Sequence, residues 1–166
     1  IGLPGVASSK EPAPIAVALP GDLSYCFDAS ECRLRYVWKG GFIEGTPYWK
    51  ANGSSLAKLD GEVVYTEPSF PLAASSGPKN PELKFLGYRV GKDGLPSFRY
   101  TRAGIPWQET IRPLPDGSGI ERLFETGGTE ALEVAPDPAA TVTTSTGTPR
   151  IDAAAAKSFT LTYRWK

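Results

Sequence analysis

Apolar and polar residues alternate along short stretches of this chain, and turns rich in glycine and proline separate each stretch from the next. Such alternation is typical of β-strands that bury one face. Eighteen glycines and sixteen prolines also interrupt the chain too often for long helices. The pattern predicts strands at residues 15–19, 22–27, 31–38, 62–66, 83–90, 97–102, 107–112, 120–125, 131–134, 140–145 and 158–165.

About ten short strands with turns between them predict an all-β fold, a single antiparallel β-sandwich with long aromatic loops. Residues 1–13 are expected to form an extended N-terminal linker, and residues 14–166 the β-sandwich domain. The alanine-rich residues 151–157 predict one or two helical turns at most. We expect one continuous core with contributions from Tyr36, Trp38, Val64, Phe85, Tyr88, Phe98, Tyr100, Leu123 and Leu161.

Two connections between predicted strands are long, residues 39–60 and 67–81. Long connections in a compact domain usually carry function or pack on themselves. The first contains Phe42, Tyr48 and Trp49, and a fourth ring, Trp107, follows a Gly-Ile-Pro turn. Exposed Trp and Tyr are enriched at binding hot spots, so these four residues are candidate binding residues. The simpler alternative is that the rings fold inward and cap an open end of the sandwich.

The two cysteines lie on opposite arms of a predicted hairpin. Strands 22–27 and 31–38 flank an Asp-Ala-Ser turn, and a three-residue loop there places Cys26 opposite Cys32. Opposed strand positions bring Cβ atoms to roughly 4.5–5.5 Å, so the spacing predicts a disulfide. A disulfide indicates an exported protein. A reduced cross-strand pair in a cytosolic domain is the open alternative.

The 166 residues contain no histidine. This excludes Ser-His-Asp and Cys-His nucleophilic catalysis and most zinc, copper and iron sites. Lysine plus arginine equals aspartate plus glutamate, 18 of each, so the basic face of a general nucleic-acid-binding protein is not expected. No apolar run is long enough for a membrane span. The chain contains no methionine, so we expect a mature or cleaved product.

Carboxylate chemistry is the enzymatic route that remains. Glycoside hydrolysis needs two carboxylates beside a substrate cleft, and Glu44, Asp60, Glu62 and Glu67 surround the aromatic connection. The alternative is that these acids belong to a mixed, solvated surface, and we assign no catalytic residue. Loop aspartates show no calcium-binding spacing, so no metal is expected.

Several segments resemble a known family: residues 19–38, 41–44, 61–65, 70–72, 85–90, 96–100 and 112–122, together with Trp49. The chain is similar there to the β-rich accessory domain of large exported bacterial proteins that also carry c-type cytochrome modules. The resemblance covers most of the chain from about residue 14 onward. It implies a β-rich fold, export to the periplasm or the outside of the cell, and a protein partner, a c-type cytochrome or membrane redox complex. The chain lacks the Cys-x-x-Cys-His of haem attachment, so no cofactor is expected on it.

Three functions follow from these observations. The leading hypothesis is a non-catalytic, exported accessory or docking domain of a cytochrome-containing electron-transfer assembly. The second is a carbohydrate-binding module that uses the loop aromatics, and the third is a carboxylate-based glycoside hydrolase. Under the first hypothesis we expect docking through the connections 39–60 and 67–81, with modest salt dependence because the net charge is zero.

Overall fold

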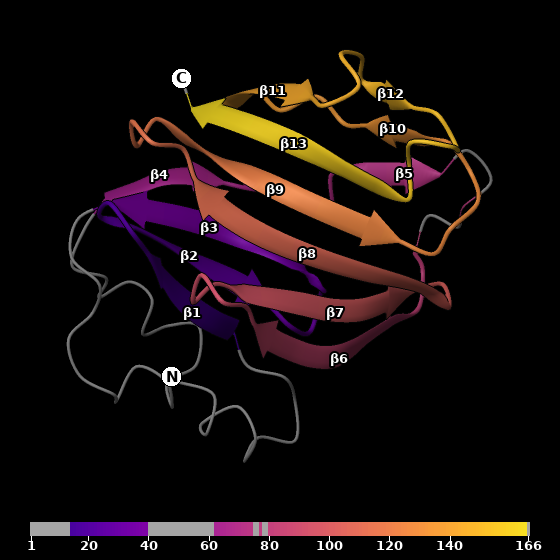
Figure 1. The fold of residues 1–166 in the computed structure, drawn as a ribbon, viewed down its shortest axis with the longest axis horizontal. Helices are drawn as coiled ribbons and strands as arrows, with labels where there is room; N and C mark the ends of the chain where they lie inside the picture. Colours follow the sequence, from indigo (N-terminus) through magenta and orange to yellow (C-terminus); the bar gives the residue numbers. More distant parts are fainter. Residues whose placement is uncertain (1–13, 40–61, 75–76, 78–79, 166) are drawn as a thin grey trace. The chain divides into compact units, whose positions relative to one another are not determined.

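The protein was analysed as a computed structural model, which describes residues 14–39, 62–74, 77 and 80–165. These residues form thirteen strands in three antiparallel sheets and contain no helix (Figure 1). The predicted all-β, antiparallel fold class is confirmed. With no helix in the described part, none there is long and apolar enough to cross a membrane.

The chain divides into two compact units, one ending at Ser69 and the other beginning at Phe70. The first unit contains a four-stranded sheet in the order β1-β2-β3-β4. Its strands are β1 (Pro14–Leu19), β2 (Leu23–Asp28), β3 (Arg33–Lys39) and β4 (Glu62–Thr66). Every residue of β2 is buried, and the strand lies between β1 and β3 in the sheet.

The second unit contains a six-stranded sheet in the order β11-β13-β9-β8-β7-β6 and a three-stranded sheet in the order β12-β10-β5. The larger sheet consists of β6 (Leu83–Val90), β7 (Pro96–Arg102), β8 (Ile105–Pro113), β9 (Gly119–Thr126), β11 (Ala140–Thr144) and β13 (Ser158–Trp165). The smaller one consists of β5 (Leu72–Ala74), β10 (Leu132–Val134) and β12 (Arg150–Ile151). The predicted single domain over 14–166 therefore stays a prediction.

A β-bulge in β6 brings two core aromatics onto one face. Phe85 and Tyr88 are three residues apart, so a regular strand would direct them to opposite faces. The pairing with β7 shifts between Phe85 and Gly87, and Gly87 has a φ of 124°, a conformation that other residues rarely adopt. Both rings consequently lie near Phe98, at centroid distances of 6.5 and 6.3 Å.

The predicted core is only partly correct. Trp38, Phe98, Tyr100 and Leu161 are buried, whereas Tyr36, Val64, Phe85 and Tyr88 are half-buried. Leu123 was placed on the wrong face of β9, because the buried residues there are its neighbours Arg122 and Phe124.

Two short strands were missed. β5 lies inside the predicted connection 67–81, which is more ordered than expected because β5 pairs with β10 and its first residue, Leu72, is buried. β12 occupies the start of the segment expected to form helical turns. After it, the amides of Ala155 and Ala156 both donate to the carbonyl of Asp152, which makes a tight turn without a helix.

Candidate functional site

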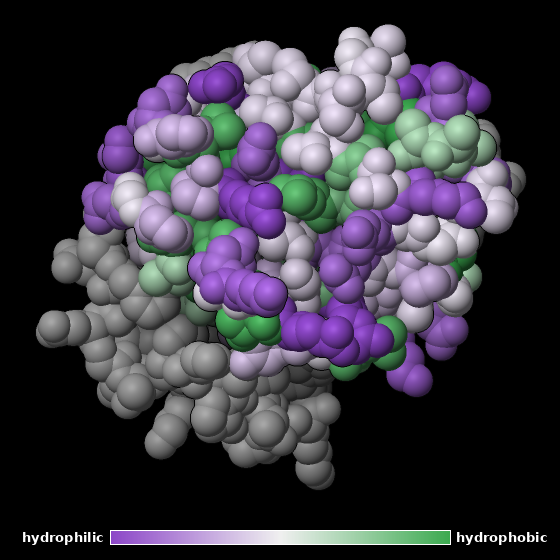
Figure 2. Space-filling view, viewed as in Figure 1, coloured by the Kyte–Doolittle hydropathy of each residue, from purple (hydrophilic) through white to green (hydrophobic). Residues whose placement is uncertain are grey.

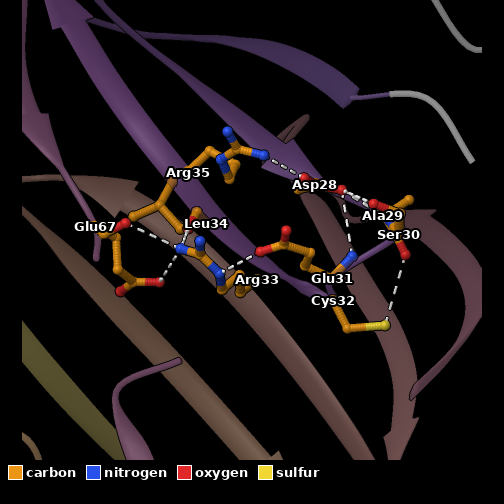
Figure 3. Close-up of polar contacts among 9 residues, drawn as sticks. All are labelled: Asp28, Ala29, Ser30, Glu31, Cys32, Arg33, Leu34, Arg35 and Glu67. Carbon is orange, nitrogen blue, oxygen red and sulfur yellow. Dashed lines mark hydrogen bonds and ion pairs between the residues drawn. The ribbon is translucent and has the colours of Figure 1, made fainter. Parts of the chain in front are cut away.

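The densest group of polar contacts lies where the β2–β3 hairpin turns (Figure 3). Asp28 ends β2 and is buried. Its Oδ1 accepts hydrogen bonds from the Ser30 amide (2.9 Å), the Ser30 hydroxyl (2.5 Å) and the Glu31 amide (3.2 Å). Its Oδ2 accepts from Arg35 Nη1 at 2.6 Å. The carboxylate therefore closes the turn and ties it to β3, as Asp does in turns that bond their own backbone.

A second carboxylate, Glu67, contacts Arg33, which lies two residues before Arg35 on β3. Arg33 Nη1 donates to the Glu67 carbonyl at 3.0 Å and lies 3.9 Å from Glu67 Oε1, while Arg33 Nε donates to Glu31 at 2.8 Å. The Glu67 side chain is 1% exposed. Arg33 thus fastens the chain that leaves β4 to the hairpin turn (Figure 3).

The predicted disulfide between Cys26 and Cys32 is not present, and this expectation is corrected here. Cys26 pairs across the sheet with Tyr36, because the register shifts at a bulge after Cys26 and the turn spans four residues, 29–32. Cys32 lies within that turn at a φ of 52°, and its thiol donates to the carbonyl of Ala29 at 3.6 Å. The three-residue loop that would have opposed the two cysteines does not form.

Both thiols are buried, and their surroundings do not favour reactivity. Burial raises the pKa of the Cys26 thiol to about 12, and the neighbouring hydroxyl of Tyr36 opposes this shift only in part. Burial likewise raises the pKa of Tyr36. Only the thiolate acts as a nucleophile or a metal ligand, and the raised pKa keeps Cys26 protonated at neutral pH. Cys26 is therefore a structural residue of the sheet. Export therefore loses the support that a disulfide would have lent it.

We expect two thiols per chain when the unreduced protein is unfolded in urea and titrated with a disulfide reagent. In the folded protein Cys26 should react much more slowly than a model thiol, because burial keeps it protonated. Cys26→Ala and Cys32→Ala variants assign each signal. A titration that finds no thiol in the unfolded, unreduced chain would restore the disulfide and with it the argument for export.

Asp28 should make stability depend on pH. Burial by itself would raise the pKa of this carboxyl, but hydrogen bonds from Ser30 and Arg35 outweigh it and the pKa lies below its ordinary value. A lowered folded-state pKa stabilises the protein above the unfolded value near 3.8, and this stability is lost as pH falls through the folded value. Asp28→Asn should therefore cost about 1–3 kcal/mol at neutral pH and progressively less below about pH 4.

Urea unfolding of both proteins across this pH range measures the difference. The matched control is Asp116→Asn. Asp116 accepts the same pair of hydrogen bonds from the residue two positions on, Ser118, but its side chain is 65% exposed. Its replacement should change stability much less. Equal effects of the two substitutions would show that burial and Arg35 add nothing to the Asp28 turn.

The six-stranded sheet contains a fully buried ion pair that was not predicted from the sequence. Arg122 Nε donates to Glu109 Oε2 at 2.7 Å, and both side chains are 0% exposed. The hydroxyl of Tyr100 donates to the other carboxylate oxygen at 3.4 Å. The Arg122 guanidinium also lies over the rings of Phe124 and Tyr163, at 5.2 and 5.1 Å, which is within cation–π range.

A signal for this pair exists in the sequence. Glu109 has Trp107 and Ile111 two positions away on either side, and Arg122 has Ile120 and Phe124 in the same places. In a strand, residues at i±2 share one face. Large apolar neighbours at these spacings therefore indicate that both charged residues face inward.

The structure describes one of the four candidate binding residues. Phe42, Tyr48 and Trp49 lie outside the described residues. Trp107 is buried, at 8% exposure, and its ring meets Phe70 and Phe124 edge-on at 5.5 and 6.0 Å. It offers no open ring face for stacking on a ligand, so the inward-folded alternative holds for this residue.

The candidate carboxylates are likewise divided. Glu44 and Asp60 lie outside the described residues. Glu62 is exposed on β4, whereas Glu67 is buried beside Arg33. Within the part of the chain that the structure describes, no group of three or more Cys, Asp or Glu residues is placed to hold a metal ion.

Comparisons with family models, curated proteins and solved structures find no match to this chain.

Proposed function

We propose that this chain is a non-catalytic docking domain that binds a protein partner through its surface. The observation that carries the proposal is the use made of the buried carboxylates. Asp28, Glu67 and Glu109 are the buried acids of the described residues, and each lies beside an arginine. These acids stabilise a turn, a strand exit and a sheet.

A carboxylate-based hydrolase needs a different arrangement. Its general acid holds a proton near neutral pH, which requires a raised pKa beside a substrate cleft. Hydrogen bonds lower the pKa of Asp28 instead, and the side chains of Glu67 and Glu109, 1% and 0% exposed, lie beside arginines inside the fold. The described acids therefore support a binding domain better than a glycosidase.

We further propose that the domain is exported and serves a cytochrome-containing electron-transfer assembly, without a cofactor of its own. The support for this assignment is the resemblance of segments such as 19–38 and 112–122 to accessory domains of such proteins. The carbohydrate-binding alternative receives no support from Trp107, which is buried.

The test is affinity capture by the immobilised full chain from a membrane extract of the source cells. We expect a captured protein that carries covalently bound haem, visible in the optical spectrum and by haem staining of the denatured band. An immobilised chain unfolded beforehand is the control for non-specific capture. Capture of no haem protein, together with binding to a glycan panel, would replace this proposal with the carbohydrate-binding one.

A further inference from the structure

The strand β6 is an edge of the six-stranded sheet as far as the described residues show. Among the described residues it pairs with β7 alone, and none of its eight residues is buried. Leu86 and Val90 are each 45% exposed. Figure 2 shows hydrophilic and hydrophobic side chains next to one another along the rim where Figure 1 places β6 and β7.

The hydrogen bonds at the two ends of β6 indicate which of its backbone groups face outward. The Gly91 amide donates to Leu95, and the Ala103 amide donates to Glu82. In an antiparallel pair, hydrogen-bonded and non-hydrogen-bonded positions alternate. Counting inward from each end, the residues whose amides and carbonyls point away from β7 are Leu83 and Phe85 before the bulge, and Tyr88 and Val90 after it.

Three cations border this edge. Lys84 and Arg89 are exposed on β6, and Arg99 is exposed on β7 opposite Gly87, between the positions of the other two. None of the three forms an ion pair within the described residues. Their cross-strand neighbours on the same sheet are Thr101, Ser97 and Gln108.

The other cations of β7 and β8 are placed differently. The Arg102 guanidinium on β7 lies 3.6 Å from the centroid of the Phe70 ring. Arg112 on β8 lies opposite Glu121 and within 3.5 Å of Asp93. The chain as a whole has no net charge, whereas β6 contains two cations and no acid, the nearest acid in sequence being Glu82 just before the strand. Exposed charges interact over about 8 Å at physiological salt. This range is comparable to the distance between diagonal positions on two paired strands, so the three cations act on the same stretch of the edge.

The same cations disfavour a second copy of this chain as the occupant. If two β6 strands paired antiparallel about the middle of the strand, Lys84 of one copy would face Arg89 of the other. Like charges directly opposed in a sheet are destabilising. Edge lysines and bulges are also the devices by which proteins prevent self-association of sheet edges.

We propose that the β6 edge, defined as residues 83–90 with Arg99, binds an extended, acidic segment of a partner protein as an added strand. Outward backbone groups pair with the segment, its carboxylates meet Lys84, Arg89 and Arg99, and its apolar residues, which alternate with them, cover Val90 on the face of Phe85 and Tyr88. This inference rests on the proposed docking function and specifies its partner. It also moves the contact from the connections 39–60 and 67–81 to a sheet edge.

The probe is a short fluorescent peptide with alternating valine and glutamate. We expect it to bind the full chain, to bind more weakly as salt rises, and to shift the amide resonances of β6 and β7 in a spectrum of the isotope-labelled protein. Two altered peptides keep the protein unchanged: one has glutamine for glutamate, and one has alternate amides methylated on nitrogen. Both altered peptides should bind at least about tenfold more weakly than the parent peptide, since one lacks charge and the other lacks strand pairing.

The matched protein variants are Lys84→Glu/Arg89→Glu at the edge and Arg150→Glu/Lys157→Glu as the control. All four positions are exposed and both doubles change the charge equally. We expect about tenfold weaker binding for the edge variant and none of this loss for the control. Equal binding by both variants, equal binding of the methylated peptide, or a wild-type dimer in sedimentation would each overturn the inference.

The captured haem protein separates this inference from the proposed function. If the edge variant still captures it from the membrane extract, the docking function stands and the β6 edge is the wrong surface. If the wild-type chain binds the acidic peptide but captures no haem protein, the edge binds its ligand and the proposed cytochrome partner is wrong. Stronger binding to an anionic polysaccharide than to the peptide would assign the edge to a different class of ligand and overturn the inference.

Discussion

Replacement of Glu109 by alanine should lower the free energy of unfolding by about 3–5 kcal/mol, because it leaves the guanidinium of Arg122 buried without its carboxylate. The two side chains are 2.7 Å apart and 0% exposed. They lie diagonally across the β8–β9 pair, with Ile111 opposite Arg122. Urea unfolding followed by tryptophan fluorescence measures the change, and Arg122→Ala should show a loss of similar size.

The informative control removes both charges together. In a Glu109→Leu/Arg122→Met double variant no buried charge remains, so stability should be close to that of the parent or above it. The exposed acid Glu125 supplies a second control, since Glu125→Ala should change stability by about 0.5 kcal/mol or less. A Glu109→Ala protein as stable as the parent would show that water reaches the pair.

The long strands could be predicted from the sequence because each alternates over several residues. The segments 83–90 and 158–165 were predicted with their observed bounds. β5 has three residues, of which two are alanine, and β12 has two residues, so neither shows an alternation of apolar and polar side chains. Their existence depends on pairing with β10, a tertiary interaction that local pattern does not contain.

The cysteine hairpin could not be predicted in detail because its register depends on backbone conformation. A three-residue loop and a four-residue turn fit the same residues, and the choice between them moves every cross-strand pair. Cys32 adopts a positive φ of 52°, which is uncommon for a residue that is not glycine. The hydrogen bonds of Asp28 favour the longer turn, and only the folded geometry reveals them.

The residues of the candidate site could likewise be predicted only in part. The sequence singled out Glu67 as one of four acids around the aromatic connection, but its burial beside Arg33 requires the hairpin to be formed. The prediction of Leu123 as a core residue put its neighbour Arg122 on the solvent face, where most arginines lie. Its buried partner lies thirteen residues earlier, on another strand. The predicted face was wrong, although the apolar residues two positions away on either side of Arg122 indicate the observed one.

Phe98→Ala should destabilise the second unit by about 3–5 kcal/mol, a large part of the roughly 5–15 kcal/mol that a domain possesses. Phe98 is 0% exposed, and the rings of Phe85 and Tyr88 lie against it through the bulge of β6. Truncation leaves a cavity that the strands cannot close without moving the bulge.

The next residue provides the matched control. Arg99 is on the opposite face of the same strand and is exposed, so Arg99→Ala should change the free energy of unfolding by about 0.5 kcal/mol or less. Because Arg99 borders the β6 edge, Arg99→Ala should weaken binding of the acidic peptide while leaving stability intact. Phe98→Ala should lower stability, and the molecules that remain folded should bind the peptide as the parent does. Similar unfolding midpoints for the two variants would mean that β7 presents its other face to the core. The placement of Lys84, Arg89 and Arg99 on the solvent face of the sheet would then be wrong as well.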